Sequence, residues 1–279
     1  MKLFQKLIFF SMIVLSVSCN KKEPIVDKIS ETSVDLQMIE AYEAGIEELE
    51  KGNVLVAAKK FNEAELLYPQ SKWAPRAALM SAYSYYSQDY YNDSIYELER
   101  FLKVYPIHER TNYAYYLLAM SYYDQIVDEK KDLGPIINAK ENFEIIIEKF
   151  PNSDFALDAE YKLDLIQEIL ASKEMYLARY YIEREKWIPA INRFKFVLEN
   201  YDQSIFVEEA IHRLVEIYYR IGLIEESKKY AYLLGYNYQS SEWYENSYKV
   251  FNKDYKLKSK LKKKKGKNPI INRIKSLLN

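Results

Sequence analysis

The stretch AAKKFNEAELLYP, residues 57–69, combines small and large apolar residues at helical spacing and closes on an aromatic residue and proline. Four later stretches repeat the pattern: SIYELERFLKVYP (94–106), AKENFEIIIEKFP (139–151), AINRFKFVLENYD (190–202) and SKKYAYLLGYNYQ (227–239). The copies close at positions 69, 106, 151, 202 and 239, so their spacings are 37, 45, 51 and 37. Spacings of this size indicate helical repeats, and the tetratricopeptide pattern of about 34 residues is the nearest.

Small residues in the first copy fall where two packed helices would touch. Gly45 would let the first helix approach the second, Gly52 falls in the turn, and Phe61 would fill the gap between neighbouring repeats. Ala57 and Ala64 flank Phe61 at small–large–small spacing. The other copies keep small and large residues in the same register: Ala82, Tyr85, Ser94 and Leu98; Ala119, Tyr122, Ala139 and Phe143; Ala178, Tyr181, Ala190 and Phe194; and Tyr218, Gly222, Ser227 and Ala231. This agreement predicts an all-α fold, a tetratricopeptide-repeat solenoid of five helix pairs.

Extra length separates the third copy from the fourth. LDAEYKLDLIQEILASKEM (157–175) is an unbroken helical pattern, so we expect a long helix between repeats three and four. SEWYENSYKVF (241–251) would cap the last repeat. We therefore predict repeats one to three over residues 37–156, and the long helix, repeats four and five and the capping helix over residues 157–253.

The N-terminus has the composition of an export signal. Two lysines precede an uncharged run from Leu7 to Val17, which is shorter than the roughly 20 residues that a membrane span needs. A basic start followed by a short apolar run is typical of a secretory signal peptide, predicted here over residues 1–18. Cys19 follows directly and is the chain's single cysteine, so it cannot form an internal disulfide. Residues 19–36 are the expected linker to the repeats.

Residues 254–279 form a predicted basic tail. Ten Lys and Arg and no acidic residue lie in 256–275, and since the formal net charge of the chain is -1, the remainder carries -11. Two interpretations stay open. The tail is a solvated extension, or it is attracted to anionic lipid headgroups by about 1 kcal/mol per basic residue, with NPIINRIKSLLN (268–279) as an amphipathic helix. Nucleic acid is not an expected partner because the chain is predicted to be exported.

Residues that carry catalysis or bind metals do not form a recognisable pattern. His108 and His212 are the only histidines, and both are expected to face solvent or to pack. The sequence has no metal-ligand spacing, no glycine-rich phosphate loop and no hydrolase motif. Carboxylate pairs such as Glu208/Glu209 are expected on solvated helix faces. We therefore expect no enzyme, no metal site and no cofactor; a hydrolase that uses helix-borne carboxylates is the alternative, without a convergent site.

The chain is rich in tyrosine, with 28 residues of this type. SAYSYYSQDYY (81–91) and TNYAYYLLAMSYYDQ (111–125) place tyrosines on more helix faces than one core stripe uses. Most are expected to pack between repeats, whereas others would line a concave surface and bind extended peptide through a flat apolar ring and a hydroxyl. The second group is expected to contain Tyr86, Tyr90, Tyr113 and Tyr116.

Four longer stretches are more specific than the repeat spacing: YPQSKWAPRAALMSAYSYYSQDYY (68–91), TNYAYYLLAMSYYDQI (111–126), LASKEMYLARYYIEREKWIPAINRF (170–194) and LLGYNYQSSEWYENSY (233–248). Together with the signal peptide, the lone cysteine and the five copies, they resemble the tetratricopeptide-repeat lipoprotein family of the bacterial outer-membrane β-barrel assembly machinery. The resemblance covers essentially the whole mature chain up to the basic tail.

The resemblance implies a lipid anchor at Cys19. This residue would carry an N-acyl group and an S-diacylglycerol, and multiple acyl chains give durable anchoring. Val17 and Ser18 fit the family's lipidation motif, whereas Ser16 stands where leucine is usual. Asn20 in place of aspartate implies the outer membrane, with the chain on the periplasmic face.

The resemblance also implies partners. The C-terminal repeats would bind periplasmic domains of BamA, the central insertase, and the N-terminal repeats would bind unfolded outer-membrane proteins; other lipoproteins of the complex are further partners. The residues expected on the BamA side are Trp187, Asn192 and Arg193, of which Arg193 is the main candidate because a guanidinium suits a carboxylate across an interface. The residues expected to face substrate are Trp73, Arg76, Tyr83, Tyr86 and Tyr90, together with Tyr113 and Tyr116.

The predicted function is a non-catalytic scaffold for folding and insertion of barrel proteins into the outer membrane. The alternative is another periplasmic tetratricopeptide-repeat lipoprotein adaptor, acting in cell-wall synthesis or envelope division. The proteins that co-purify from membranes would separate the two, because the first predicts barrel-assembly subunits and the second predicts peptidoglycan synthases.

Overall fold

The computed structural model describes residues 34–128 and 132–251. The predicted signal peptide, Cys19 and the basic tail from residue 254 lie outside these residues. Every regular element in the described ranges is a helix, so the all-α prediction is confirmed. The chain divides into two compact units, one ending at His108 and the other beginning at Glu109. Within the described ranges, no helix combines the length and the hydropathy that a membrane span requires.

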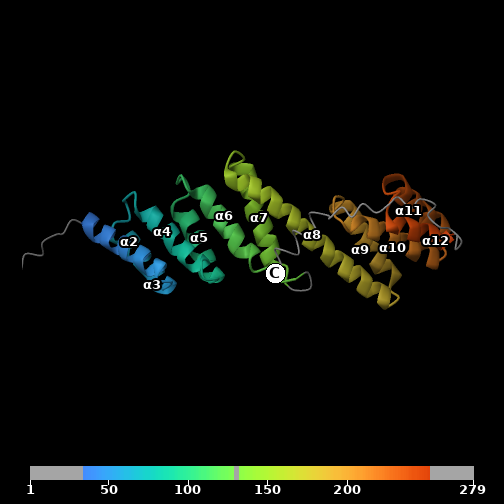
Figure 1. The fold of residues 1–279 in the computed structure, drawn as a ribbon, viewed down its shortest axis with the longest axis horizontal. Coiled ribbons are helices and arrows are strands. Elements are labelled where there is room, and N and C mark those ends of the chain that lie inside the picture. The colour runs from blue at the N-terminus through green and yellow to red at the C-terminus, as the bar shows by residue number, and fades with distance from the viewer. Residues whose placement is uncertain (1–33, 129–131, 252–279) are drawn as a thin grey trace, which may run out of the picture. The chain divides into compact units, whose positions relative to one another are not determined.

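The first unit consists of two helix pairs. Consecutive helices lie side by side (Figure 1), and their order is α2 (Val34–Glu50), α3 (Val54–Leu67), α4 (Ala74–Tyr86) and α5 (Tyr91–Val104). Phe61, which was expected to fill the gap between repeats, is fully buried. A β-carbon added to Gly45 would lie 2.8 Å from two atoms of the Phe61 ring, so this position needs glycine for the close approach of α2 and α3.

A buried ion cluster also holds the first unit together. Glu65 of α3 and Glu97 of α5 are both less than one-tenth exposed. Arg100 donates to both oxygens of Glu65 at 2.8 and 2.6 Å and, through Nε, to Glu97 at 2.9 Å. The Tyr105 hydroxyl donates to Glu65 at 2.8 Å, and burial together with this hydrogen bond raises the pKa of Tyr105. The two buried carboxylates are thus paired, as burial of charge requires.

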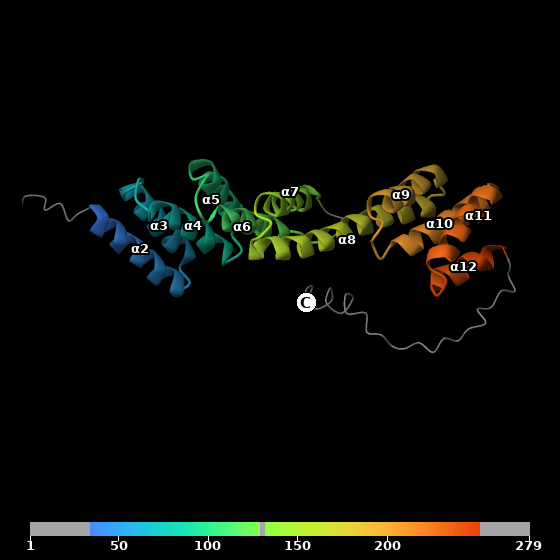
Figure 2. The same cartoon turned by 90° about the horizontal axis from the view of Figure 1, so that it is seen from above.

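The second unit contains the remaining helices. They are α6 (Thr111–Tyr123), α7 (Gly134–Lys149), α8 (Asp154–Glu183), α9 (Trp187–Asn200), α10 (Val207–Arg220), α11 (Ile224–Asn237) and α12 (Glu242–Phe251). α12 packs against α10 and α11 (Figure 2), in the position expected for a capping helix. Phe143 of α7 and Phe194 of α9 are fully buried at the positions equivalent to Phe61.

The long helix α8 extends beyond the unbroken pattern at 157–175 that predicted it. Its 30 residues run on through Ala178 and Tyr181 of the fourth copy, and it begins where the Ser153 hydroxyl accepts a hydrogen bond from the Ala156 amide at 3.2 Å. The first part of α8 buries Ala159 and Ile166 against α6 and α7, and the last part buries Met175 and Ala178 against α9 and α10. One helix therefore belongs to two hydrophobic clusters of the second unit.

Four of the helix pairs share one turn geometry. The residue two positions before the next helix has a positive φ in each case: Gly52 (79°), Asp89 (63°), Glu185 (54°) and Gly222 (85°). Glycine adopts this conformation without steric cost, whereas other residues are strained there. Gly52, which was expected in the turn of the first copy, and Gly222 of the fifth copy therefore have a conformational role.

Candidate partner-binding site

A pocket of about 310 Å³ lies between α8 and α9 in the second unit, and we call it the α9 pocket. It is lined by Tyr181, Ile188, Pro189, Asn192, Arg193 and Phe196. The five α9 residues recur at helical spacing, so they share one face of that helix. Ile188 is 63% exposed and Phe196 is 41% exposed, although both are large apolar side chains. The pocket thus combines exposed apolar surface with one cation and one amide.

Arg193 is held at the pocket by one ion pair. Its Nη1 donates to Oε2 of Glu174 on α8 at 2.9 Å, and the two side chains are 42% and 14% exposed. A guanidinium carries five N–H donors. Since Glu174 is the single hydrogen-bond partner of Arg193 among the described residues, donors of this guanidinium remain for a ligand.

The three residues expected on the BamA side are only partly brought together. Asn192 and Arg193 both line the α9 pocket. Trp187 does not line it: its ring is half-buried against the hydrophobic cluster of α8, α9 and α10, and the Arg220 guanidinium carbon lies 5.0 Å from the ring centroid. Trp187 therefore packs the start of α9 onto α10, with a cation–π contact.

A second concavity lies in the first unit, and we call it the α2 groove. It has a volume of about 230 Å³ and is lined by Ile39, Tyr42, Glu43, Ile46 and Trp73. Trp73 meets the Tyr42 ring edge-on at 5.3 Å between centroids, and Arg76 lies over Trp73 at 5.5 Å. Two of the residues expected to face substrate, Trp73 and Arg76, are therefore brought together at or beside this groove.

The other expected substrate residues do not line the α2 groove. Tyr83 is an exposed residue of α4 and Tyr86 is the last residue of that helix, where its ring contacts the Tyr91 ring at 5.9 Å. Tyr90 directly precedes α5. Tyr113 and Tyr116 belong to the second unit and both contact the ring of Phe155 on α8.

The Tyr116 hydroxyl is already used inside the second unit. It donates to Oδ2 of Asp158 at 2.8 Å, and burial followed by this hydrogen bond raises the pKa of Tyr116. Its ring stacks on Phe155 at 4.8 Å between centroids. Tyr116 thus ties α6 to α8.

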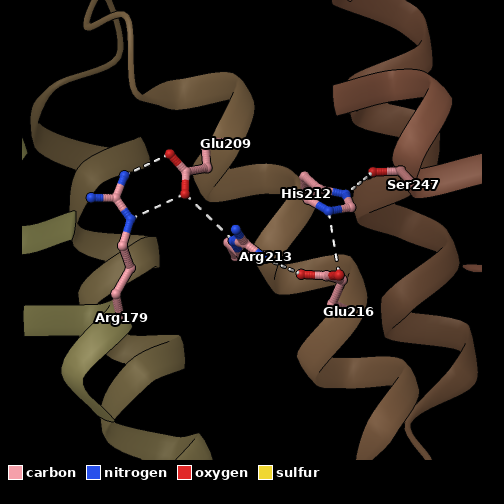
Figure 3. A network of polar contacts seen from close by, with 6 residues as sticks. All are labelled: Arg179, Glu209, His212, Arg213, Glu216 and Ser247. Atoms are coloured by element: carbon pink, nitrogen blue, oxygen red, sulfur yellow. Dashed lines mark hydrogen bonds and ion pairs between the residues drawn. The ribbon is translucent and has the colours of Figure 1, made fainter. Parts of the chain in front are cut away.

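A polar network joins α8, α10 and α12 (Figure 3). Arg179 donates to both oxygens of Glu209 at 3.1 and 2.6 Å, and Arg213 joins Glu209 to Glu216. His212 is 3% exposed; its Nδ1 lies 2.8 Å from the Ser247 hydroxyl and its Nε2 lies 3.5 Å from Glu216. The expectation of a solvated face for Glu209 is wrong, because its side chain is only 12% exposed and binds two arginines.

Ser247, His212 and Glu216 have the residue types of a hydrolytic triad, but their arrangement does not expose a nucleophile. A catalytic serine must present its oxygen to substrate, and Ser247 is fully buried between α12 and α10. These contacts hold α12 onto α10, with the Trp243 ring 5.2 Å from the His212 ring. Among the described residues, His, Cys, Asp and Glu form no group of three that could hold a metal ion.

A family model named YfiO and described as "Outer membrane lipoprotein" matches residues 34–234. The match includes every residue that lines the α2 groove and the α9 pocket. The chain belongs to the YfiO family. Helix α12, with the Ser247 end of the polar network, lies beyond the matched residues.

Relatives of this YfiO member carry a more specific name. Those from Caulobacter vibrioides and Rickettsia prowazekii are each named "Outer membrane protein assembly factor BamD". The first is 36% identical over 76% of this chain and 69% of its own length, and the second is 39% identical over 75% and 83%. A solved thermophilic TPR protein of Thermus thermophilus aligns over 77% of this chain and 98% of its own, at 16% identity and a TM-score of 0.35. The resemblance to BamD is confirmed by the sequence relatives.

Sequence reasoning missed most residues that line the two concavities in this YfiO member. On α9, Ile188 and Phe196 are apolar residues at four-residue intervals on either side of Asn192, outside the buried set Ala190 and Phe194. This four-residue spacing predicts a second apolar stripe on α9, separate from the buried one. The α2 residues Ile39, Tyr42 and Ile46 recur at intervals of three and four residues, which packing between repeats explains equally well. Glu174 gave no signal, because its pairing with Arg193 depends on how α8 and α9 face each other.

Proposed function

We propose that this chain is a lipid-anchored scaffold of the outer-membrane β-barrel assembly complex, without a catalytic role of its own. Membership of the BamD family supports assembly at the outer membrane, and the α9 pocket is the observation that carries the docking function. Protein interfaces are built from buried apolar side chains and are enriched in arginine. The pocket offers both, because it has exposed apolar side chains and an arginine with remaining donors.

The α9 pocket is the proposed docking site for the periplasmic domains of BamA. Arg193 would pair with a carboxylate of BamA, Asn192 would hydrogen-bond, and Ile188 and Phe196 would bury apolar surface. Close charge pairs across a protein interface have coupling energies of about 1.5–7 kcal/mol in a well-studied complex. Trp187 is assigned the indirect role of holding the start of α9.

The test is co-purification from detergent-solubilised membranes with the Arg193→Glu variant. We expect the variant to lose most of its BamA while its circular dichroism spectrum stays helical, because the substitution reverses one exposed charge outside the hydrophobic core. Unchanged recovery of BamA would exclude Arg193 from the interface. Recovery of peptidoglycan synthases in place of barrel-assembly subunits would instead support the adaptor of cell-wall synthesis or envelope division.

The α2 groove is the proposed contact for unfolded outer-membrane proteins. Trp73, Tyr42 and Arg76 form an aromatic and cationic surface beside Ile39 and Ile46, which suits aromatic-rich amphipathic segments. A photo-crosslinker at position 73 is expected to capture such a segment of a client barrel protein. The same crosslinker at Tyr96, an exposed residue that does not line the groove, is the matched control. Equal capture at both positions would remove the groove from the proposal.

Cys19 is the proposed attachment point for the lipid, and it would place the scaffold on the periplasmic face of the outer membrane among the other lipoproteins of the complex. The support comes from the sequence, in which an apolar leader ends at Val17 and Ser18 before the single cysteine. Mass spectrometry of the mature protein is expected to find an N-acylated, S-diacylglyceryl Cys19 as the first residue. An unmodified Cys19, or cleavage elsewhere, would contradict the anchor.

A further inference from the structure

Two arginine–glutamate pairs in the second unit are matched in burial. Arg193 and Glu174 are 42% and 14% exposed, and Arg179 and Glu209 are 41% and 12% exposed. In both pairs the arginine is half-exposed and the carboxylate is nearly buried. If removal of the two carboxylates has different effects on binding, the cause is therefore the hydrogen bonds and neighbours of each pair, and not how deeply the pair is buried.

The hydrogen bonds of the two pairs differ. Arg179 uses Nε and Nη2 to bind both oxygens of Glu209, which also receives Arg213 at 3.4 Å. Arg193 uses only Nη1, on one oxygen of Glu174. The bidentate pair has the geometry of a strong internal contact, whereas the single bond commits little of the guanidinium.

The neighbours differ as well. Among the described residues, Arg193 lines the α9 pocket and Arg179 does not. A carboxylate that entered this pocket to bind Arg193 would share the guanidinium with Glu174, which is itself held within 2.9 Å of Nη1. Two carboxylates on one guanidinium repel each other at short range, because like charges within several ångströms interact unfavourably even near a protein surface.

We propose that Glu174 is an electrostatic competitor of the partner's carboxylate at Arg193: it leaves donors of the guanidinium open, but its charge repels the incoming carboxylate. This inference rests on the proposed docking of BamA at the α9 pocket. In the free protein Glu174 keeps the guanidinium paired; in the complex its charge opposes the incoming carboxylate. Glu174 thereby lowers the affinity and shortens the lifetime of the complex, so that docking stays reversible.

The test is a double-mutant cycle on the full acylated chain in detergent, with the purified periplasmic domains of BamA from the same host as the probe. Glu174→Gln keeps the size of the side chain and an oxygen for Arg193, but removes the charge. We expect roughly three- to ten-fold tighter binding, mostly through slower dissociation, and a smaller gain at high salt because the effect is electrostatic. In the Arg193→Ala background, Glu174→Gln should change the affinity less than about two-fold, since no shared guanidinium remains.

Glu209→Gln is the matched control, because it removes an equally buried carboxylate from a pair that does not line the pocket. We expect this variant to bind with unchanged affinity. Helical circular dichroism and the melting temperature of every variant establish that it is folded before binding is compared.

The outcomes separate the inference from the proposed function. If Arg193→Ala does not weaken binding, the docking site itself is wrong and the role of Glu174 falls with it. Suppose instead that Arg193→Ala weakens binding, while Glu174→Gln weakens it too or leaves it unchanged. The docking site is then supported, but the proposed role of Glu174 as a competitor is wrong. A gain from Glu174→Gln that persists in the Arg193→Ala background also overturns the competitor, because the effect would not pass through Arg193.

Discussion

One arginine of the first unit and one of the second, Arg100 and Arg193, use their hydrogen-bond donors in different ways. In the first unit Arg100 uses three donors on Glu65 and Glu97, and both carboxylates are buried. In the second unit Arg193 uses one donor on Glu174 beside an open pocket. An arginine that pairs two buried carboxylates is needed inside the fold, because its removal leaves both charges buried without it, whereas an arginine with remaining donors and exposed apolar neighbours is suited to a partner. Under the proposed docking function, the difference separates a structural arginine from a partner-binding arginine within one chain.

The strongest test of this comparison removes the two arginines in turn. Arg100→Ala is expected to lower the free energy of unfolding of the first unit by about 3–5 kcal/mol, because two buried carboxylates lose their partner. Arg193→Ala should lower the stability of the second unit by about 1 kcal/mol or less, since Arg193 is half-exposed. Hydrogen exchange measured by mass spectrometry in urea reports each unit separately. Equal losses in the two units would break the comparison.

A second test compares glycines at close contacts. Gly45→Ala and Gly235→Ala would both place a β-carbon 2.8 Å from an aromatic ring, of Phe61 and Tyr244 respectively. Overpacking of this kind costs about 1–3 kcal/mol. The loss should be larger for Gly45, because Phe61 is fully buried and cannot move, whereas Tyr244 is half-buried and can turn aside. Thermal unfolding of the two variants measures the difference, and a larger loss for Gly235 would contradict this explanation.

A third test concerns the shared turns, where the two units should behave alike. Asp89→Gly in the first unit and Glu185→Gly in the second should each raise stability by about 0.5–1 kcal/mol, because glycine removes the strain of a positive φ. The gain should be smaller for Asp89, since aspartate tolerates this conformation better than glutamate does. Chemical denaturation checks both variants. A loss of stability in Asp89→Gly would show that the hydrogen bond which its carboxylate accepts from the Tyr91 hydroxyl at 2.7 Å outweighs the strain. A loss in Glu185→Gly would contradict the strain explanation.

The smallest expected effect is a pH dependence confined to the second unit. Burial alone would raise the pKa of Glu216, but the hydrogen bonds and charges of His212 and Arg213 outweigh it and lower the value from its usual 4.5 to about 2. A lowered pKa stabilises the folded state above pH 4.5, and this stabilisation is lost as the pH falls from 4.5 towards 2. Since the side chain is 41% exposed, the effect is screened and small.

Glu216→Gln should flatten the acid dependence of α12 docking between pH 4.5 and pH 2. Fluorescence of Trp243 near His212 and Arg213 follows this docking. If the acid dependence is the same in the variant and the parent chain, other carboxylates control the transition.

The helical periodicity of the sequence predicted the fold well because helix packing depends on local spacing. Phe61, Phe143 and Phe194 follow from the small–large–small pattern, and all three are buried. The sites were harder to predict. The pocket around Arg193 follows partly from the apolar stripe of α9, but its pairing with Glu174 depends on how two helices face each other. Periodicity along one helix does not contain that information, so a carboxylate such as Glu209 was expected in solvent and is an internal partner.

The continuity of α8 has a mechanical consequence for the second unit. A straight helix of 30 residues is about 45 Å long and turns by about 100° per residue. Inserting one residue between Ile166 and Met175 would therefore rotate the face that carries Glu174 by about 100° relative to α7, even if every helix stayed intact. The angular position of the α9 pocket is thus set by the length of α8. Single substitutions on this helix leave the direction of the pocket unchanged. An insertion or deletion preserves that direction only if it adds or removes close to a whole number of turns.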